Sequence, residues 1–147
     1  MAASAGVWSE LATARLADAG FRRGGARAAV IELLDDQSCA LSAYEIEAKL
    51  REGGRGVARA TVYRVLDQLE GLGLLTKIEV GQGIARYEPN RPGSDHHHHM
   101  VCGRCGEVIP FADAELEATL DRVAERVTFD VDEHEIVLHG ACADCQG

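Results

Sequence analysis

Hydrophobic residues in the first part of the chain recur at helical spacing. A loose stripe of Leu11, Leu16 and Ala19 predicts a helix that Gly20 should end. A denser apolar pattern at residues 30–34 predicts a second helix. Both are expected to be ordinary core helices.

Two further helices follow with clearer signals. In "SAYE", Ser42 is followed three residues later by Glu45, the pair that forms a capping box at a helix N-terminus, and Gly53 should end this helix. The next is "ARATVYRVLDQLEGLG", residues 58–73. Its apolar stripe consists of Val62, Val65, Leu66, Leu69 and Leu72.

After these helices, the sequence has patterns that are typical of β-strands. "TKIEV" and "IARYE" flank "GQG", which predicts a hairpin over residues 76–88. Helices followed by a hairpin are the order of elements in a winged helix-turn-helix. Residues 1–88 are therefore expected to form a winged-helix DNA-binding domain.

A second domain is expected after "PNRPGSD", residues 89–95, which holds two of the three prolines and is the predicted hinge. "HMVC", "EVIPF" and "EIVLHG" have strand patterns, and "DAELEATLDRVAERV" has a helical one. The apolar face of that helix consists of Leu116, Leu120, Val123 and Val127. Residues 96–147 should thus form a small α/β domain, and the whole chain an α+β fold.

The charge is unevenly divided between these parts. The chain of 147 residues has a net charge of −9, but residues 1–90 hold 11 basic and 12 acidic residues, whereas residues 91–147 hold 4 and 12. The first part can therefore still carry a basic face for nucleic acid. With no apolar run long enough for a bilayer and no export signal, we expect a soluble cytoplasmic protein without a membrane partner.

Four of the five cysteines occur as two Cys-x-x-Cys pairs, Cys102 with Cys105 and Cys142 with Cys145. Four thiolates are the ligand set of a closed tetrahedral zinc site, which predicts structural Zn²⁺. The alternatives are two unrelated reduced pairs or a thiol–disulfide switch. A secreted disulfide framework is disfavoured by the length of the chain.

The four histidines of "DHHHHMVC" are internal to the chain and precede a predicted strand. Because side chains alternate along extended backbone, His97 and His99 should face one way and His96 and His98 the other, so that one run can serve two metal sites. Further donors stand at Glu88, Glu117 and His134. This donor set suits Fe²⁺, Zn²⁺, Mn²⁺ or Ni²⁺. The alternative is a solvated polar loop.

The fourth helix has a charge pattern that favours an external anion. Arg59 and Arg64 lie toward its positive end and Asp67 and Glu70 toward its negative end, which opposes the helix macrodipole. Duplex DNA is the natural anion, whereas a solvated helix is the alternative. The expected contacts are guanine for Arg64, thymine methyl groups for Tyr63 and phosphate for Thr61 or Arg59, with Lys77 in the wing and Arg27 as further phosphate candidates.

The chain resembles the ferric uptake regulator (Fur) family of metal-sensing repressors through "ATVYRVL", "RYE", "HHHHMVCGRCGEVIPF" and "CADC". The resemblance implies a C-terminal domain that dimerises and structural zinc on the two cysteine pairs. It also implies a second site within that domain and an interdomain sensing site. These consist of His96, His98, Glu117 and His134, and of Glu88, His97 and His99.

One departure concerns the sensing site. Many relatives supply a histidine just before the "SA" of the third helix, where this chain has Ala40. Cys39 is the nearest donor, either as a thiolate ligand that favours zinc or as a small buried side chain. Glu88 looks more like the iron sensors, so the regulatory metal stays open between Zn²⁺ and Fe²⁺.

The expected function is a homodimeric repressor of metal uptake or homeostasis genes that binds a palindromic operator with metal as corepressor. A peroxide-sensing repressor of the same family is the alternative. A metalloenzyme or a metal-storage protein is less well supported, because no HExxH, GxSxG or phosphate-binding loop is present and storage needs no recognition helix. We expect neither enzymatic activity nor a small-molecule substrate.

Overall fold

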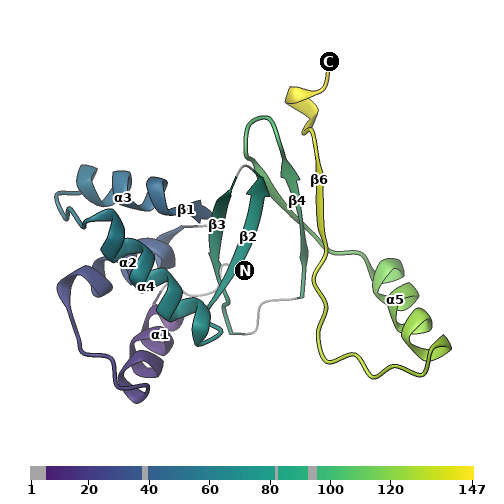
Figure 1. The fold of residues 1–147 in the computed structure, drawn as a ribbon, viewed down its shortest axis with the longest axis horizontal. Helices are drawn as coiled ribbons and strands as arrows, with labels where there is room; N and C mark the ends of the chain where they lie inside the picture. The colour runs from purple at the N-terminus through teal and green to yellow at the C-terminus, as the bar shows by residue number, and fades with distance from the viewer. Residues whose placement is uncertain (1–5, 38–39, 82, 93–95) are drawn as a thin grey trace. The chain divides into compact units, whose positions relative to one another are not determined.

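The computed structural model describes residues 6–37, 40–81, 83–92 and 96–147 (Figure 1). The chain divides into two compact units, residues 1–94 and residues 95–147. Within the described residues, the first unit combines several helices and the second unit one α-helix with a three-stranded sheet, so the predicted α+β class is confirmed. No helix in the described ranges is both long and apolar enough to cross a membrane.

The first unit contains four helices and a small antiparallel sheet in the order β1-β3-β2. Its helices are α1 (Val7–Asp18), α2 (Gly25–Asp36), α3 (Ala43–Glu52) and α4 (Arg59–Gly71). Its strands are β1 (Leu41–Ser42), β2 (Leu75–Gly81) and β3 (Ile84–Pro89). The hairpin of β2 and β3 follows α4 directly, which is the predicted winged-helix order.

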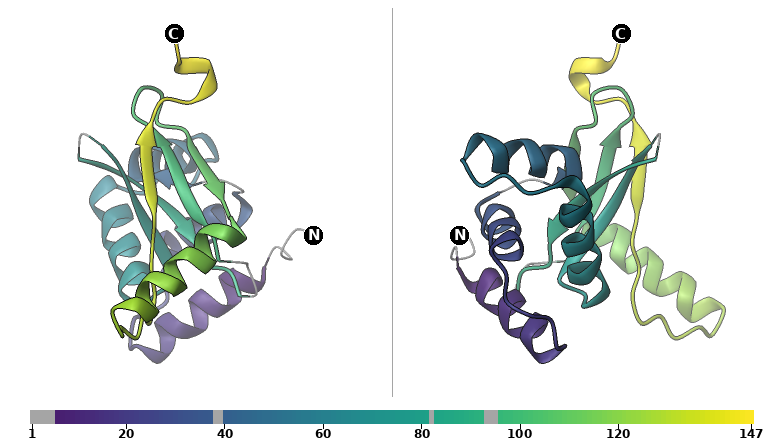
Figure 2. Two further views of the ribbon diagram at one scale, coloured as in Figure 1. Left: turned by 90° about the vertical axis from the view of Figure 1, so that its right-hand side faces the viewer. Right: turned by 60° about the vertical axis from the view of Figure 1, so that its left-hand side comes forward.

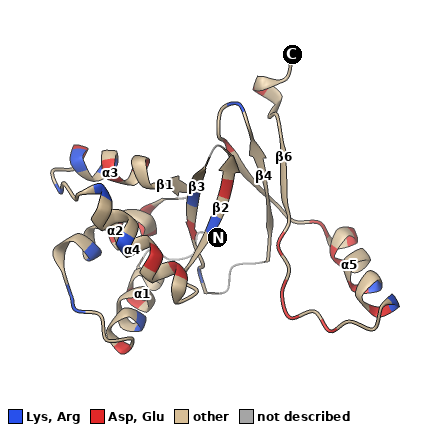
Figure 3. Ribbon diagram, in the orientation of Figure 1, with Lys and Arg blue, Asp and Glu red and all other residues tan. Residues whose placement is uncertain are grey.

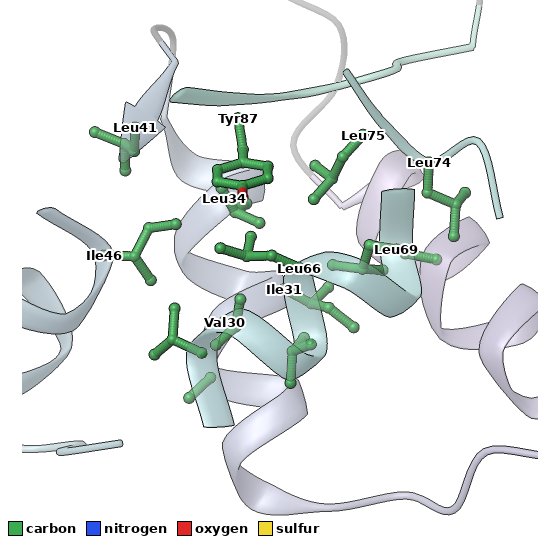
Figure 4. Close-up of a cluster of buried hydrophobic side chains, with 14 of the residues drawn as sticks. Val30, Ile31, Leu34, Leu41, Ile46, Leu66, Leu69, Leu74, Leu75 and Tyr87 are labelled. Atoms are coloured by element: carbon green, nitrogen blue, oxygen red, sulfur yellow. The ribbon is translucent and has the colours of Figure 1, made fainter. Parts of the chain in front are cut away.

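The core of this unit lies between the helices and one face of the sheet. Figure 4 shows Tyr87 directed from β3 into a cluster of aliphatic side chains that includes Leu34 and Leu66. Trp8 is buried in α1, and its indole Nε1 donates to the Leu74 carbonyl at 3.0 Å. The stripe expected for this first helix was partly wrong, because Ala19 is exposed.

The capping of α3 agrees with the sequence. The backbone N–H of Glu45 donates to Ser42 Oγ at 3.2 Å, and the helix ends before Gly53. Such a cap stabilises a helix by about 1 kcal/mol. It places the start of α3 directly after β1, and therefore beside the wing strand β3 with which β1 pairs.

The beginning of the predicted hinge is attached to the first unit. Pro89 is the last residue of β3, and Arg91 Nη1 bonds to Asp35 Oδ1 of α2 at 2.6 Å. The same carboxylate accepts the Gly6 N–H at 2.7 Å. Burial alone would raise the pKa of Asp35, but the hydrogen bonds from Arg91 and Gly6 outweigh it and the pKa is lowered. Asp35 is thus ionised where the chain leaves β3.

The second unit contains one helix and a mixed sheet in the order β5-β4-β6. Its elements are β4 (His98–Cys102), β5 (Val108–Phe111), α5 (Ala114–Arg126), β6 (Val137–Gly140) and a short 3-10 turn (Ala143–Cys145). Strand β4 pairs antiparallel with β5 and parallel with β6. Figure 2 shows β6 in yellow beside β4, reached through the long loop after α5.

Helix α5 has an apolar face that its own unit leaves uncovered. Leu116 and Leu120 are half-buried, whereas Val123 and Val127 are 46% and 69% exposed. No residue of α5 is buried. Exposed apolar side chains also occur elsewhere in the unit, namely Met100, Ile109, Phe129, Val131 and Leu138. A surface of this kind marks an interaction site.

Candidate metal centres and nucleic-acid interface

The two cysteine pairs meet at one end of the second unit. Cys102 ends β4 and Cys105 lies in the following turn, whereas Cys142 precedes the 3-10 turn after β6 and Cys145 is its last residue. Parallel pairing of β4 with β6 brings Cys102 opposite Gly140. The four Sγ atoms all lie within 4.8 Å of one another.

The geometry of these thiols fits a tetrahedral zinc ion. Zn–S bonds of about 2.3 Å give an S···S edge of about 3.8 Å, and Cys105 Sγ lies 3.7 Å from Cys142 Sγ. The backbone N–H of Cys105 donates to Cys102 Sγ. This bond and those from the backbone of Cys142 and Arg104 lower the pKa of the Cys102 thiol to about 6. Hydrogen bonds to the sulfur of Cys142, and then to those of Cys102 and Cys105, raise the pKa of Cys145 to about 12. A bound dication would allow all four to ionise.

A second donor cluster joins the histidine run to α5 and to the loop before β6. His98 Nε2 lies 2.6 Å from Glu117 Oε1, and His134 Nε2 lies 2.7 Å from Glu117 Oε2. His96 Nε2 lies 3.1 Å from His134 Nε2. One ligand atom from each of these four residues lies within 4.8 Å of the others. Imidazole and carboxylate donors that converge on one point suit a divalent transition metal.

Hydrogen bonds already orient part of this cluster. The Ile136 N–H donates to His98 Nδ1 at 3.2 Å, which leaves the ring proton of neutral His98 on Nε2, facing Glu117. Hydrogen bonds from His98 and then His134 lower the pKa of Glu117, so this carboxylate is ionised. A cation at Nε2 would move the proton of the neutral His98 ring to Nδ1, which could then no longer accept the hydrogen bond from the Ile136 N–H.

The remaining predicted ligands are divided between the units. His97 and His99 lie on the other side of the run from His96 and His98, with ring centroids 4.9 Å and 4.6 Å apart within the respective pairs. The expected alternation of the four histidines is therefore present. Glu88 belongs to β3 of the first unit, so its membership of an interdomain site stays a prediction. Cys39 lies outside the described residues.

Helix α4 presents the residues that were expected to contact DNA. Val62, Leu66 and Leu69 are buried on its inner face, whereas Tyr63 and Arg64 are exposed. Thr61 is half-buried near the helix start. Figure 3 shows both basic and acidic segments on α3 and α4, and mainly acidic segments on α5 and the loop after it. The predicted asymmetry of charge thus applies to the two units.

Arg59 has an internal partner that the sequence did not indicate. Its Nε donates to Glu47 Oε2 at 2.7 Å, and its Cζ lies 4.1 Å from the ring centroid of Tyr44. Both partners lie on α3. The hydrogen bond to Glu47 raises the pKa of Arg59. The macrodipole argument for an external anion at Arg59 is therefore weakened, because Glu47 supplies a negative charge within the protein.

Two other candidate contacts are also engaged within the first unit. Arg27 Nη2 donates to Gln68 of α4 at 3.0 Å, and Nη1 bonds to the Arg22 carbonyl, so that Arg27 connects α2 to α4. Lys77 of β2 lies 3.8 Å from Glu79 and stays partly exposed. A phosphate contact by Arg27 would compete with these bonds. Lys77 is partly exposed and could contact a phosphate in spite of its ion pair with Glu79.

Comparison with known proteins points to one family. The model of the ferric uptake regulator family matches residues 18–139. The ferric uptake regulation protein of Neisseria meningitidis is 37% identical over 134 residues, 90% of this chain and 92% of the relative. The structure of the Helicobacter pylori ferric uptake regulator has a TM-score of 0.86 at 26% identity and covers 98% and 95% of the two chains. A zinc uptake regulator complexed with zinc and DNA has a TM-score of 0.58 at 28% identity and covers 93% and 91%.

Proposed function

The chain belongs to the ferric uptake regulator family, and on this premise we propose that it is a metal-dependent DNA-binding repressor of metal uptake or homeostasis genes. One observation carries the proposal: a single chain combines an exposed recognition helix with a histidine run whose alternate members face two sides. Family membership supports a regulator rather than an enzyme.

Two kinds of metal are proposed. Zn²⁺ on the four cysteines is structural, because four thiolates close the coordination sphere. Zn²⁺ or Fe²⁺ is the regulatory metal, held by Glu88, His97 and His99, with Cys39 as a further candidate. The cluster of His96, His98, Glu117 and His134 is a third site. The Helicobacter pylori ferric uptake regulator, whose structure reveals three functional metal-binding sites, supports this number.

The regulatory metal acts as corepressor by restricting the orientation of the units. Two histidines of the second unit and a carboxylate of the first can share one ion only in a subset of domain orientations. Without metal, a smaller fraction of molecules is competent to bind the operator, and the apparent affinity falls in proportion to that fraction.

The function is tested by selection of duplex DNA from a random pool with protein that carries Zn²⁺ or, without oxygen, Fe²⁺. We expect enrichment of a palindrome only when the regulatory metal is present, because two recognition helices of a dimer would read two half-sites. Absence of any enriched sequence under both metals would overturn the proposal.

Arg64→Ala should weaken binding to the selected duplex by roughly 1–3 kcal/mol and relax the base preference at one position of each half-site. The reason is the loss of a bidentate guanidinium contact from the exposed face of α4. Fluorescence anisotropy and a repeated selection measure the two effects. Arg122→Ala on α5 is the matched control, and an Arg64 variant that behaves like it would remove Arg64 from the interface.

Homodimerisation through the second unit is proposed from its uncovered apolar face. Val123→Asp should weaken the dimer by about 2–4 kcal/mol, or roughly 30- to 700-fold, because two valines per dimer lose their burial and two carboxylates would have to be desolvated. Sedimentation over a concentration series measures this. Val7→Asp on α1 is the control, because the exposures of Val7 and Val123 are 47% and 46%. Equal dimerisation of both variants would place the interface elsewhere.

A further inference from the structure

Glu47 lies between two arginines at the junction of α3 and the recognition helix α4. Its Oε1 accepts a hydrogen bond from Arg51 Nη2 at 2.9 Å, and its Oε2 accepts one from Arg59 Nε at 2.7 Å. Only 14% of its side chain is exposed, compared with 69% for Arg51 and 49% for Arg59. A carboxylate bonded through both oxygens is held in one orientation, and it holds Arg59 in turn.

Tyr44 restrains the same guanidinium on a second side. The Arg59 Cζ lies over the Tyr44 ring, 4.1 Å from its centroid, while the Nε of the same group donates to Glu47. Nearly half of the Arg59 side chain is nevertheless open to solvent. Arg59 is thus a fixed but accessible cation at the first residue of the recognition helix.

Electrostatic attraction to DNA does not explain why a carboxylate occupies position 47. Affinity for arbitrary duplex DNA rises with each phosphate that a basic side chain neutralises, and Glu47 offsets one of the two neighbouring guanidinium charges. A mobile Arg59 without Glu47 would reach phosphates in many registers along the duplex. An Arg59 held in one orientation can contact a phosphate with good geometry in only a few registers of the protein along the duplex. Phosphate contacts of this kind set the position of the protein on DNA.

We propose that Glu47 is a specificity-determining residue, which lowers binding to arbitrary duplex DNA and restricts Arg59 to phosphate contacts compatible with the operator register. It acts through Arg59 and is therefore a positioning residue rather than a base-reading one. The inference rests on the proposed function, since it requires sequence-preferring DNA binding.

The test compares Glu47→Gln with Glu52→Gln, which removes the same charge from an exposed position of the same helix. Arg59→Lys keeps the positive charge but loses the planar group that Glu47 and Tyr44 hold. Two probes are used with the metal-loaded dimer: the duplex selected by the wild-type protein and a random-sequence duplex of equal length. Affinity for each is measured over a salt series, and thermal unfolding verifies that the variants are folded.

Glu47→Gln should strengthen binding to the random duplex and steepen the slope of log K against log salt by about 0.9 per protomer. The ratio of selected to random affinity should fall by roughly fivefold. Arg59→Lys should lower that ratio similarly, and combining it with Glu47→Gln should add little, because both changes remove one interaction. Glu52→Gln should leave the ratio unchanged.

The outcomes separate this inference from the function on which it rests. An unchanged ratio in Glu47→Gln and Arg59→Lys, or a change that Glu52→Gln reproduces, overturns the role of Glu47 alone. A wild-type protein that selects no sequence overturns the proposed function and this inference together.

Discussion

Replacing Cys142 with serine is expected to release the cysteine-bound zinc and to loosen residues 95–147. Structural zinc contributes about 10–16 kcal/mol of binding free energy at neutral pH in small domains, and much of this becomes folding free energy. The second unit depends on it because Val101 and Cys102 are its only buried apolar residues among those described, whereas the first unit has a large aliphatic cluster. A unit of this size with so small a core needs a further constraint.

Metal analysis after mild chelation and thermal unfolding measure this result. The wild-type dimer should retain about one zinc per chain, and the Cys142 variant should lose it together with the unfolding transition of the second unit. Ala143→Ser is the matched control, because Ala143 lies in the same 3-10 turn without a thiol. Full zinc retention and an unchanged unfolding transition in the Cys142 variant would contradict the assignment of structural zinc to the four cysteines.

His97→Ala and His99→Ala are each expected to weaken metal-dependent DNA binding by about tenfold or more while the cysteine-bound zinc stays in place. Loss of one ligand from the proposed sensing site lowers metal affinity, and the fraction of molecules in the competent orientation falls with it. The measurement is affinity for the selected duplex over a range of buffered free Zn²⁺ or Fe²⁺. Total metal content alone is insufficient, because zinc fills many nitrogen sites during purification.

Two further variants sharpen this prediction. His139→Ala removes an exposed histidine of β6 and should leave the metal response unchanged. Cys39→Ser distinguishes a thiolate ligand from a small buried side chain, and a loss comparable to those of the histidine variants would favour zinc. If His97, His99 and Cys39 variants all keep the wild-type response, sensing moves to the cluster of His96, His98, Glu117 and His134.

The local periodicity of apolar residues predicted most of the secondary structure. The apolar spacing of residues 58–73 and the Ser42 cap predicted α4 and α3 within a few residues, because helix phase and capping depend on near neighbours. The spacing of the two Cys-x-x-Cys pairs predicted that the four thiols would come together, because two such pairs in one chain are typical of a shared metal site. Alternation along an extended segment likewise gave the two faces of the histidine run.

The sequence was less informative where a residue's environment depends on other elements. The stripe in the first helix missed Trp8 and included the exposed Ala19, because a loose pattern does not say which face meets the core. The sequence placed the apolar residues of α5 on one side of a helix but did not indicate how far that side is buried. Periodicity shows that a face needs a partner, whereas only the packed unit shows that its own sheet leaves that face exposed.

By itself, the sequence determined the order of the elements, the grouping of the four cysteines as one candidate metal site and the faces of α4 and of the histidine run. The family resemblance had grouped Glu117 and His134 with His98, and the structure brings these side chains together. The contact of Glu47 with Arg59 across the junction of α3 and α4 came from the tertiary structure alone. Spacing fixes the direction of a side chain relative to its own helix or strand. The partner it meets depends on how the elements pack, and that packing is set by the burial of the whole apolar surface.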